Sequence, residues 1–298
     1  MEFGKVKDPS LVDFQLPKDA PETKQILLTY KGKDFEVYVG CAKWNSGDLK
    51  GFYPKGTKDE LTYYSTQFNS IELNATFYSM PSWKQIESWK NKTPENFKFF
   101  PKLTNTISHF KRLNDVKEVV DDFCNAISNF EEKLGMAFLQ LHENFKPKDF
   151  DKLKKVIEEF PKGIPLGIEV RNEEWFNDLE ILNKFCELLE KQDMANIIVD
   201  TAGRRDMLHM RLTNSVAFIR YVGANHESDI KPLDEWITRI EKWRAEGLHK
   251  LYFFVHQNQE IESPLLATHF IEQINKVFKL KVAVPEKKLP PKDLFDVY

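Results

Sequence analysis

Short apolar segments alternate with longer amphipathic segments along most of the chain. Each short segment has the length and composition of a buried strand, and each longer segment carries apolar residues at helical spacing. We count eight such strand and helix units. Strands are expected at 37–41, from 70 onward, and at 97–102, 135–142, 165–171, 195–200, 217–223 and 250–258. Helices are expected at 58–68, 83–91, 115–131, 149–160, 178–191, 232–246 and 263–278.

Eight units in a chain of 298 residues predict the α/β class and, within it, a single (β/α)8 barrel of the TIM type. Residues 1–36 are expected to form an N-terminal extension, in which 26–30 and 35–40 pair as a hairpin leading into the first barrel strand. The barrel spans 37–280, and 281–298 form a Pro-rich C-terminal tail. In such barrels the active site lies at the carboxyl ends of the strands.

The strand that begins at Ser70 places polar residues at its carboxyl end. Glu72 and Asn74 share one side of an alternating strand, so an inward-facing side would deliver a carboxylate and an amide together. Tyr78 and its neighbour Phe77 would wall the same opening. This stretch therefore predicts part of a site.

Other expected strands end in the same way, with a polar side chain on the inward side. Glu169 and Asp200 lie on adjacent strands and are expected to form a carboxylate pair. The candidate catalytic residues are Glu169, Asp200, Lys102 and His256. The candidate substrate-binding residues are Trp44, Glu72, Asn74, Tyr78, His109, Gln140, Arg171, Arg220 and Asn258.

Several separate motifs resemble the YecE-like family of domains of unknown function. The resemblance covers roughly 37–277 and implies a TIM-barrel fold without an established reaction. Its motifs are Val39-Gly40 with Trp44, Phe52-Tyr53-Pro54, the run from Phe68 to Tyr78, Pro101-Lys102 with Ile107-Ser108-His109, Phe138-Leu139-Gln140-Leu141, and Glu169-Val170-Arg171 with Trp175. Arg220 also matches an arginine of the family.

The chain departs from the family pattern at three places. It has His142-Glu143 where the family favours prolines. Val222 and Ala224 stand where the family often has histidine and arginine. The run from His256 to Asn258 is a rearranged match to a segment with asparagines and a histidine.

Composition narrows the class of protein. The formal net charge of -3 provides no broad basic field of the kind that strong non-specific nucleic-acid binders use. Cys41, Cys124 and Cys186 are widely spaced and odd in number, which favours a reducing compartment over a disulfide framework. No apolar run is long enough to span a bilayer. We therefore expect a cytoplasmic protein without membrane contact, and its oligomeric state is left open.

Cations at fixed positions suit an anionic ligand, because guanidinium groups bind phosphate and carboxylate in bidentate fashion. The first hypothesis is an enzyme, a hydrolase, lyase or isomerase, acting on a small phosphorylated or carboxylated substrate. Glu169 or Asp200 would act as general base. Lys102, Arg171 and Arg220 would stabilise developing negative charge.

Two other function classes are consistent with the same residues. A nucleic-acid-binding or endonuclease-like barrel would stack bases on Trp44, Phe77 and Tyr78. A glycosidase would use paired carboxylates and aromatic walls, but the cations would then have no role. A divalent metal would use His256 and Glu72, although no local ligand motif supports a metal cofactor.

Overall fold

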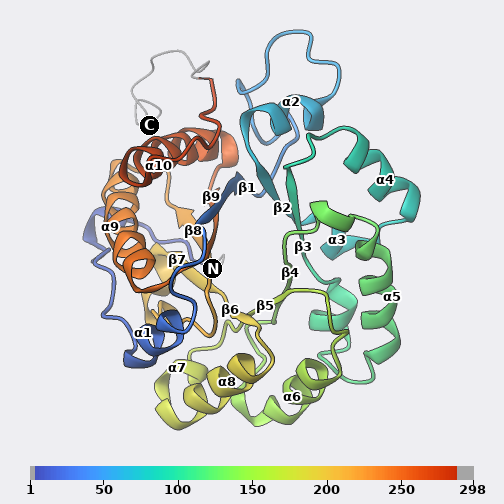
Figure 1. The fold of residues 1–298 in the computed structure, drawn as a ribbon, viewed down its shortest axis with the longest axis vertical. Coiled ribbons are helices and arrows are strands. Elements are labelled where there is room, and N and C mark those ends of the chain that lie inside the picture. Colours follow the sequence, from blue (N-terminus) through green and yellow to red (C-terminus); the bar gives the residue numbers. More distant parts are fainter. Residues whose placement is uncertain (1–3, 287–298) are drawn as a thin grey trace.

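A computed structural model describes residues 4–286 as a mixed α/β fold, with strands at the centre and helices around them (Figure 1). The strands are β1 (Glu36–Cys41), β2 (Ser70–Leu73), β3 (Lys98–Pro101), β4 (Ala137–Gln140), β5 (Leu166–Glu169), β6 (Ala195–Asn196), β7 (Ile198–Thr201), β8 (Val216–Gly223) and β9 (Lys250–Gln257). The helices are α1 (Pro21–Leu28), α2 (Glu60–Gln67), α3 (Ala75–Tyr78), α4 (Trp83–Asn91), α5 (Lys117–Ser128), α6 (Phe150–Glu159), α7 (Glu174–Asn177), α8 (Leu179–Lys191), α9 (Ile230–Glu246) and α10 (Ser263–Phe278). The predicted α/β class is confirmed.

The strands pair in parallel and form three sheets, in the orders β1-β9-β8-β7, β2-β3 and β4-β5-β6. The side chain of Asn69 joins two of these sheets, because it accepts from the Val39 amide at 2.9 Å and donates to the Val37 carbonyl at 2.8 Å. Gly40 is required at this junction, since a Cβ there would lie 2.2 Å from the Ser70 carbonyl oxygen. Neighbouring sheets therefore approach closely at their edges.

Two hydrophobic layers hold the strands in place. The inner layer lies between the strands and is largely aromatic, with Phe100, Phe138, Phe218, Tyr252 and Phe254 at its centre. The outer layer lies between the strands and the surrounding helices. Because strand side chains alternate, the residues that follow the inner layer on the same side reach the carboxyl ends of the strands. This alternation positions the candidate site.

The predicted hairpin before β1 is wrong. The segment that was expected to form its first strand belongs to helix α1, which begins at Pro21. Proline is well suited to the first helical position because its missing N–H leaves no unsatisfied donor there. Thr23 and Leu27, one turn apart, are the buried face of this helix. The apolar run at 26–28 therefore reflects a helix face and a helix end, rather than a strand.

No α-helix lies between β7 and β8 in the part of the chain that the structure describes, and none was assigned there from the sequence, although a count of eight strand and helix units implies one. After β7 the chain forms 3₁₀ turns over Ala202–Met207 and then a buried extended stretch that leads to β8. This stretch is held by α1, since the Thr23 hydroxyl donates to the Met210 carbonyl at 2.8 Å and accepts from the Leu212 amide at 3.0 Å. The N-terminal extension therefore covers the face that a sixth helix would have covered.

The described helices include none that is both long and apolar enough to cross a membrane. Of the predicted tail, residues 287–298 lie outside the described residues. At its beginning, the Glu286 amide donates to the Gln67 side chain at 2.8 Å, which attaches this part of the chain to α2. The boundaries predicted at 37 and 280 stay a prediction.

Candidate functional site

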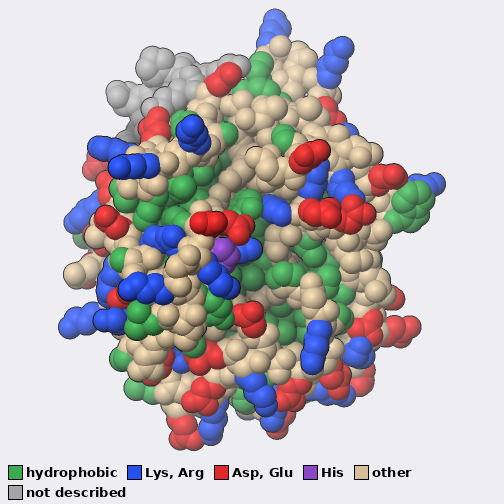
Figure 2. All heavy atoms as spheres, in the orientation of Figure 1, with side chains coloured by type: hydrophobic (Ala, Val, Ile, Leu, Met, Phe, Trp, Pro, Cys, Tyr) green, Lys and Arg blue, Asp and Glu red, His purple; other side chains and the backbone are tan. Residues whose placement is uncertain are grey.

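Seven polar side chains converge at the carboxyl ends of β2, β3, β4, β5, β8 and β9, and we term them the strand-end cluster. Its members are Glu72, Lys102, Gln140, Glu169, Arg171, Arg220 and His256. All seven were predicted from the alternation of the strands. Figure 2 shows acidic, basic and histidine side chains gathered near the middle of the face where the strands of Figure 1 meet.

Arg220 is the centre of the strand-end cluster. Its Nε and Nη2 donate to the two oxygens of Glu72 at 2.8 and 2.9 Å, and its Nη1 donates to Glu169 Oε2 at 2.6 Å. Both carboxylates are fully buried, and the guanidinium lies 5.6 Å from the ring centre of Phe138 below it. One arginine thus forms charge-assisted hydrogen bonds with carboxylates from two different sheets, Glu72 of β2 and Glu169 of β5.

These contacts keep both carboxylates charged. Burial alone would raise the pKa of Glu72, but Arg220 and His256 hold it well below its ordinary value. Burial is likewise outweighed at Glu169, where Arg220 and Arg171 lower the pKa. Arg171 Nε lies 2.7 Å from Glu169 Oε1, and about a fifth of the Arg171 side chain is exposed. Both glutamates are therefore poor proton acceptors at neutral pH.

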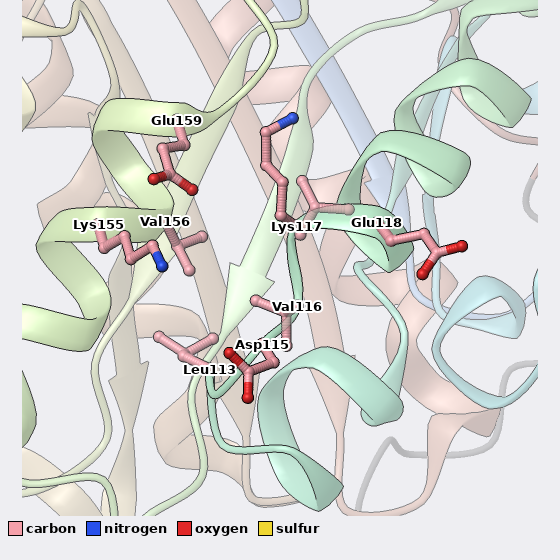
Figure 3. A pocket seen from close by; sticks show the side chains of 9 residues that line it. Leu113, Asp115, Val116, Lys117, Glu118, Lys155, Val156 and Glu159 are labelled. Carbon is pink, nitrogen blue, oxygen red and sulfur yellow. The ribbon is translucent and has the colours of Figure 1, made fainter.

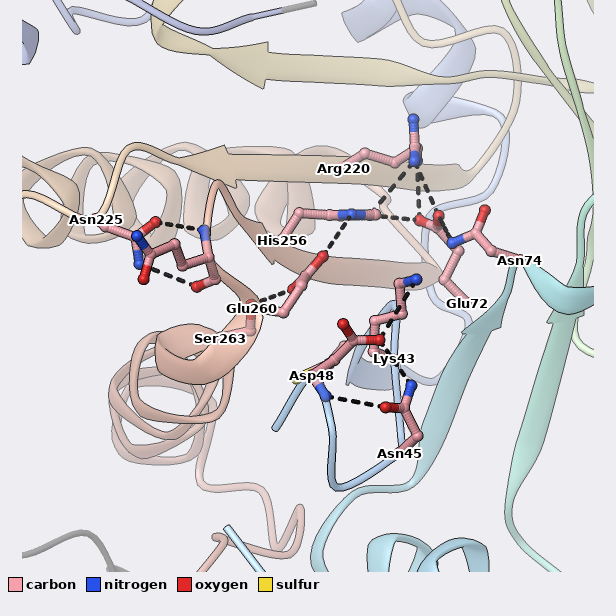
Figure 4. Close-up of polar contacts among 12 residues, drawn as sticks. Lys43, Asn45, Asp48, Glu72, Asn74, Arg220, Asn225, His256, Glu260 and Ser263 are labelled. Atoms are coloured by element: carbon pink, nitrogen blue, oxygen red, sulfur yellow. Dashed lines mark hydrogen bonds and ion pairs between the residues drawn. The ribbon is translucent and has the colours of Figure 1, made fainter. Parts of the chain in front are cut away.

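His256 lies between two carboxylates (Figure 4). Its Nε2 is 2.9 Å from Glu72 Oε2, and its Nδ1 is 3.7 Å from Glu260 Oε1. Burial would lower the pKa of His256, but the charge of Glu72 raises it above its ordinary value. Asn74 completes this side by donating to Glu72 Oε1 at 2.8 Å. The imidazole is thus favoured in its cationic, proton-donating form.

Lys102 reaches the same carboxylates only indirectly. Its Nζ donates to Gln140 Oε1 at 2.7 Å, and Gln140 Nε2 donates to Glu169 Oε1 at 2.9 Å. The ammonium also lies 4.0 Å from the ring centre of Phe77. The amide of Gln140 is therefore oriented by a donor on one side and an acceptor on the other.

The charge of Lys102 has no direct counterpart. Within residues 4–286 no carboxylate oxygen lies within 4 Å of its Nζ, although the side chain is only 8% exposed. Burial and the nearby Arg220 lower the pKa of Lys102 to about 7. The site therefore contains three carboxylates and three basic side chains besides Lys102. The carboxylates are Glu72, Glu169 and Glu260, and the basic side chains are Arg171, Arg220 and His256. Lys102 gains a full positive charge only below neutral pH.

The predicted rim residues lie around an aromatic ring that neighbours Lys102. Tyr78 is 76% exposed and contacts Phe77 edge to face, with ring centres 5.2 Å apart. The His109 ring contacts Phe77 and His142, in each case at 5.0 Å between ring centres. Burial and the neighbouring His142 lower the pKa of His109 to about 4, so the His109 ring is uncharged at neutral pH.

Three further predicted site residues, Trp44, Asn258 and Asp200, lie outside both the strand-end cluster and the group of residues around Phe77. The Trp44 ring packs against Trp89 of α4 at 5.9 Å between ring centres, as part of the outer hydrophobic layer. Asn258 is half-buried, one residue beyond the end of β9. Asp200 contacts Trp236 of α9 instead. Glu260 was missed, because it lies in the loop after β9 and only its spacing of four residues from His256 hints at the contact.

The predicted pairing of Asp200 with Glu169 is wrong. The inner layer contains Ala195, Ile197 and Val199, so Asp200 belongs to the opposite side of its strand. There its carboxylate accepts from Trp236 Nε1 of α9 at 2.7 Å and forms an ion pair with Arg205. Asp200 therefore joins β7 to α9 and to the turn that follows β7.

The strand-end cluster is a better candidate for a functional site than a hollow on the outside of the molecule. A cavity of about 220 Å³ lies between the start of α5 and α6. Figure 3 shows the side chains that line it. Its lining mixes both signs of charge, with Lys117 and Lys155 beside Asp115, Glu118 and Glu159.

Among the described residues, no group of three or more His, Cys, Asp or Glu side chains has the arrangement of a metal site.

Comparison with known proteins agrees with the motif resemblance. The chain is 25% identical over 271 residues to the UPF0759 protein YecE of Escherichia coli K12, covering 84% of this chain and 96% of that protein. It is 28% identical over 244 residues to the UPF0759 protein YunF of Bacillus subtilis 168, covering 76% of this chain and 80% of that protein.

Two solved structures share the fold. The DUF72 family protein TM1631 of Thermotoga maritima matches with a TM-score of 0.66 and 25% identity, over 82% of this chain and all of that chain. The DUF72 family protein EF0366 of Enterococcus faecalis V583 matches with a TM-score of 0.65 and 18% identity, over 83% and 99%. Residues 38–291 match the family model described as protein of unknown function DUF72, and the chain belongs to this family.

Proposed function

We propose that the three sheets close into one (β/α)8 barrel and that the strand-end cluster is the active site of an enzyme with a small anionic substrate. Closure is supported by the Asn69 bridge between β1 and β2, by the backbone pairing of Lys102 with Phe138 beside β3 and β4, and by contact between β6 and β8. Three buried, free cysteines fit a cytoplasmic location.

The observation that carries the proposal is the buried amine of Lys102. A buried cation without a carboxylate partner is unfavourable, so the folded protein favours its neutral form or a bound anion beside it. Arg171 and His256 add further positive charge nearby, while the carboxylates of Glu72 and Glu169 are already bound to Arg220. A phosphorylated or carboxylated ligand would supply the missing negative charge.

The geometry also suggests how the roles divide. A group with a pKa near the working pH is the most effective proton-transfer catalyst, and that group is Lys102. His256 is suited to donate a proton, because the charge of Glu72 raises its pKa and so favours the protonated imidazole. Glu169 was expected to be the general base, but its pKa is lowered. We therefore assign Glu169 and Glu72 to the positioning of Arg220.

The same geometry ranks the other candidates. Glycosidases place two carboxylates on either side of a sugar, whereas here Glu72 and Glu169 both bind the guanidinium of Arg220. The exposed Tyr78 beside Phe77 is the feature that a nucleic-acid-binding barrel would use. Oligonucleotides therefore belong in the panel of test ligands.

Thermal unfolding in the presence of ligands tests the proposal. We expect phosphorylated sugars or small carboxylates to raise the unfolding temperature of the wild type in a concentration-dependent way, because a ligand that binds only the folded state stabilises it. The Lys102→Met variant should lose this response. Asp200→Asn is the matched control, since it alters a buried charge outside the cluster and should retain the response. Equal responses of wild type and Lys102→Met, or stabilisation by oligonucleotides alone, would contradict the proposal.

A further inference from the structure

Building on the proposed function, we infer that Lys102 is a nucleophile that forms an imine with an anionic carbonyl compound, such as a 2-oxo acid or a phosphorylated aldehyde or ketone. The inference narrows the substrate from any anion to one with a carbonyl group next to the charged group. It rests on the surroundings of the Lys102 amine, which differ from those expected for an ammonium that serves only as a fixed charge.

The Lys102 amine is held by a single hydrogen bond to the described residues. Within the described part of the chain, the bond to Gln140 Oε1 at 2.7 Å is the only hydrogen bond of Lys102 Nζ. A lysine that serves as a structural cation uses several of its three donors, on carboxylates or carbonyl groups. The ring of Phe77, 4.0 Å away, covers one side of the nitrogen without accepting a conventional hydrogen bond. Within residues 4–286 the other two donor positions of this nitrogen make no hydrogen bond.

The surroundings favour the neutral, nucleophilic amine. Burial and the positive charges of Arg220 and Arg171 together lower the pKa of Lys102 to about 7, although Glu169 partly opposes them. About half of the amine is then unprotonated at pH 7, compared with roughly one part in 3,000 for a lysine with an ordinary pKa. Desolvation beside another cation is an established way to activate a lysine for attack on a carbonyl group.

The reaction balances without an oxidant, a reductant or a metal ion. The nitrogen lone pair of Lys102 attacks the carbonyl carbon, and a proton moves from nitrogen to oxygen to give a carbinolamine. The carbon–oxygen bond then breaks and the oxygen leaves as water, so that a carbon–nitrogen double bond replaces the carbon–oxygen double bond. When the imine is neutral, the second amine proton leaves with this water. When the imine is cationic, that proton stays on the nitrogen, and His256 or solvent supplies the proton that completes the water.

The anionic group of the substrate has partners of suitable chemistry close by. Arg171 is part of the strand-end cluster, its Nε lies 2.7 Å from Glu169 Oε1, and about a fifth of its side chain is exposed. Its positive charge also acts on Lys102. Guanidinium groups bind carboxylate and phosphate alike. A 2-oxo acid and a phosphorylated ketone would therefore both bring a carbonyl carbon toward Lys102, and the experiment includes one of each.

Borohydride trapping tests the inference, because this reductant converts an imine into a stable secondary amine. Wild type, Lys102→Met and Lys102→Arg are each incubated at pH 7 with pyruvate, glyoxylate or dihydroxyacetone phosphate and reduced, and the adducts are located by peptide mass mapping. We expect at least one probe to label Lys102 at ten times the rate of any other lysine. Lys102→Arg keeps the positive charge and should lose this adduct, while Asp200→Asn should retain it.

Parallel unfolding measurements separate the inference from the proposal on which it rests. Lactate carries the carboxylate of pyruvate without its carbonyl group and serves as the probe. If lactate, inorganic phosphate or the carbonyl probes stabilise the wild type but no adduct forms on Lys102, the anion site stands and the imine is excluded. If labelling is spread evenly over surface lysines and no anion stabilises the protein, both ideas fail. Labelling of Lys102 that lactate or phosphate slows supports both.

Discussion

Replacing Arg220 with methionine is expected to lower the free energy of unfolding by about 3–5 kcal/mol, the loss typical when one partner of a buried ion pair is removed. Without the guanidinium, the fully buried carboxylates of Glu72 and Glu169 would lose three charge-assisted hydrogen bonds. His256 and Arg171 would still contact one carboxylate each. Urea denaturation at pH 7, with wild type measured in parallel, gives the difference directly.

A variant that also removes the charge of Glu72 provides the control. In Glu72→Gln/Arg220→Met, Glu169 keeps Arg171 as its counter-charge and His256 keeps Glu260, so most of the lost stability should return. If Arg220→Met alone unfolds within about 1 kcal/mol of the wild type, which is the range of exposed ion pairs, then Arg220 is not the buried centre of this cluster.

Replacing Lys102 with methionine is expected to have the opposite sign at neutral pH and to stabilise the protein. The difference between an ordinary lysine pKa of 10.5 and a folded-state pKa of about 7 corresponds to about 5 kcal/mol against the charged form. Loss of the hydrogen bond to Gln140 would offset about 1–3 kcal/mol of this. A net gain of about 2–4 kcal/mol is therefore expected at pH 6, measured by urea denaturation.

The pH dependence identifies the cause of this gain. Between about pH 7 and 10.5 the unfolded chain holds a proton on Lys102 that the folded protein has lost, so wild-type stability rises with pH in this window. Below about pH 7 the full penalty is present in the wild type. The advantage of Lys102→Met should thus be largest at pH 6 and disappear toward pH 10, whereas Lys102→Arg should be less stable than the wild type throughout. A pH-independent loss in Lys102→Met would contradict this explanation.

Hydrophobic periodicity predicted most of the elements around the site. The helices expected at 83–91 and 263–278 have these limits in the structure, because their apolar faces repeat at helical spacing and they begin at suitable residues. The hairpin before β1 was wrong because three apolar residues in a row are compatible with either a strand or the end of a helix. No helix was assigned between the expected strands at 195–200 and 217–223, and the described chain has no α-helix there. That α1 contacts this stretch could not be predicted, since α1 comes from a distant part of the sequence.

Alternation along single strands brought together the members of the strand-end cluster, because side-chain direction in a strand has a period of two. The same rule failed for Asp200, whose strand has apolar residues on both sides and so does not reveal its inward side. Pairing within the site was also beyond the sequence. That Arg220 binds both glutamates while Lys102 contacts only an amide and a ring follows from the arrangement of separate strands.

The pKa of Lys102, measured with and without an anion, tests the central claim most directly. NMR of protein labelled with ¹³C at the lysine Cε position reports each amine during a pH titration, and Lys102→Arg identifies the resonance by its loss. We expect this resonance to titrate near pH 7 in the free protein and to shift to higher pH in saturating inorganic phosphate or lactate, which carry negative charge but no carbonyl group. Titration near pH 10.5 in the free protein, or a midpoint that neither anion changes, would contradict an anion site built around this lysine.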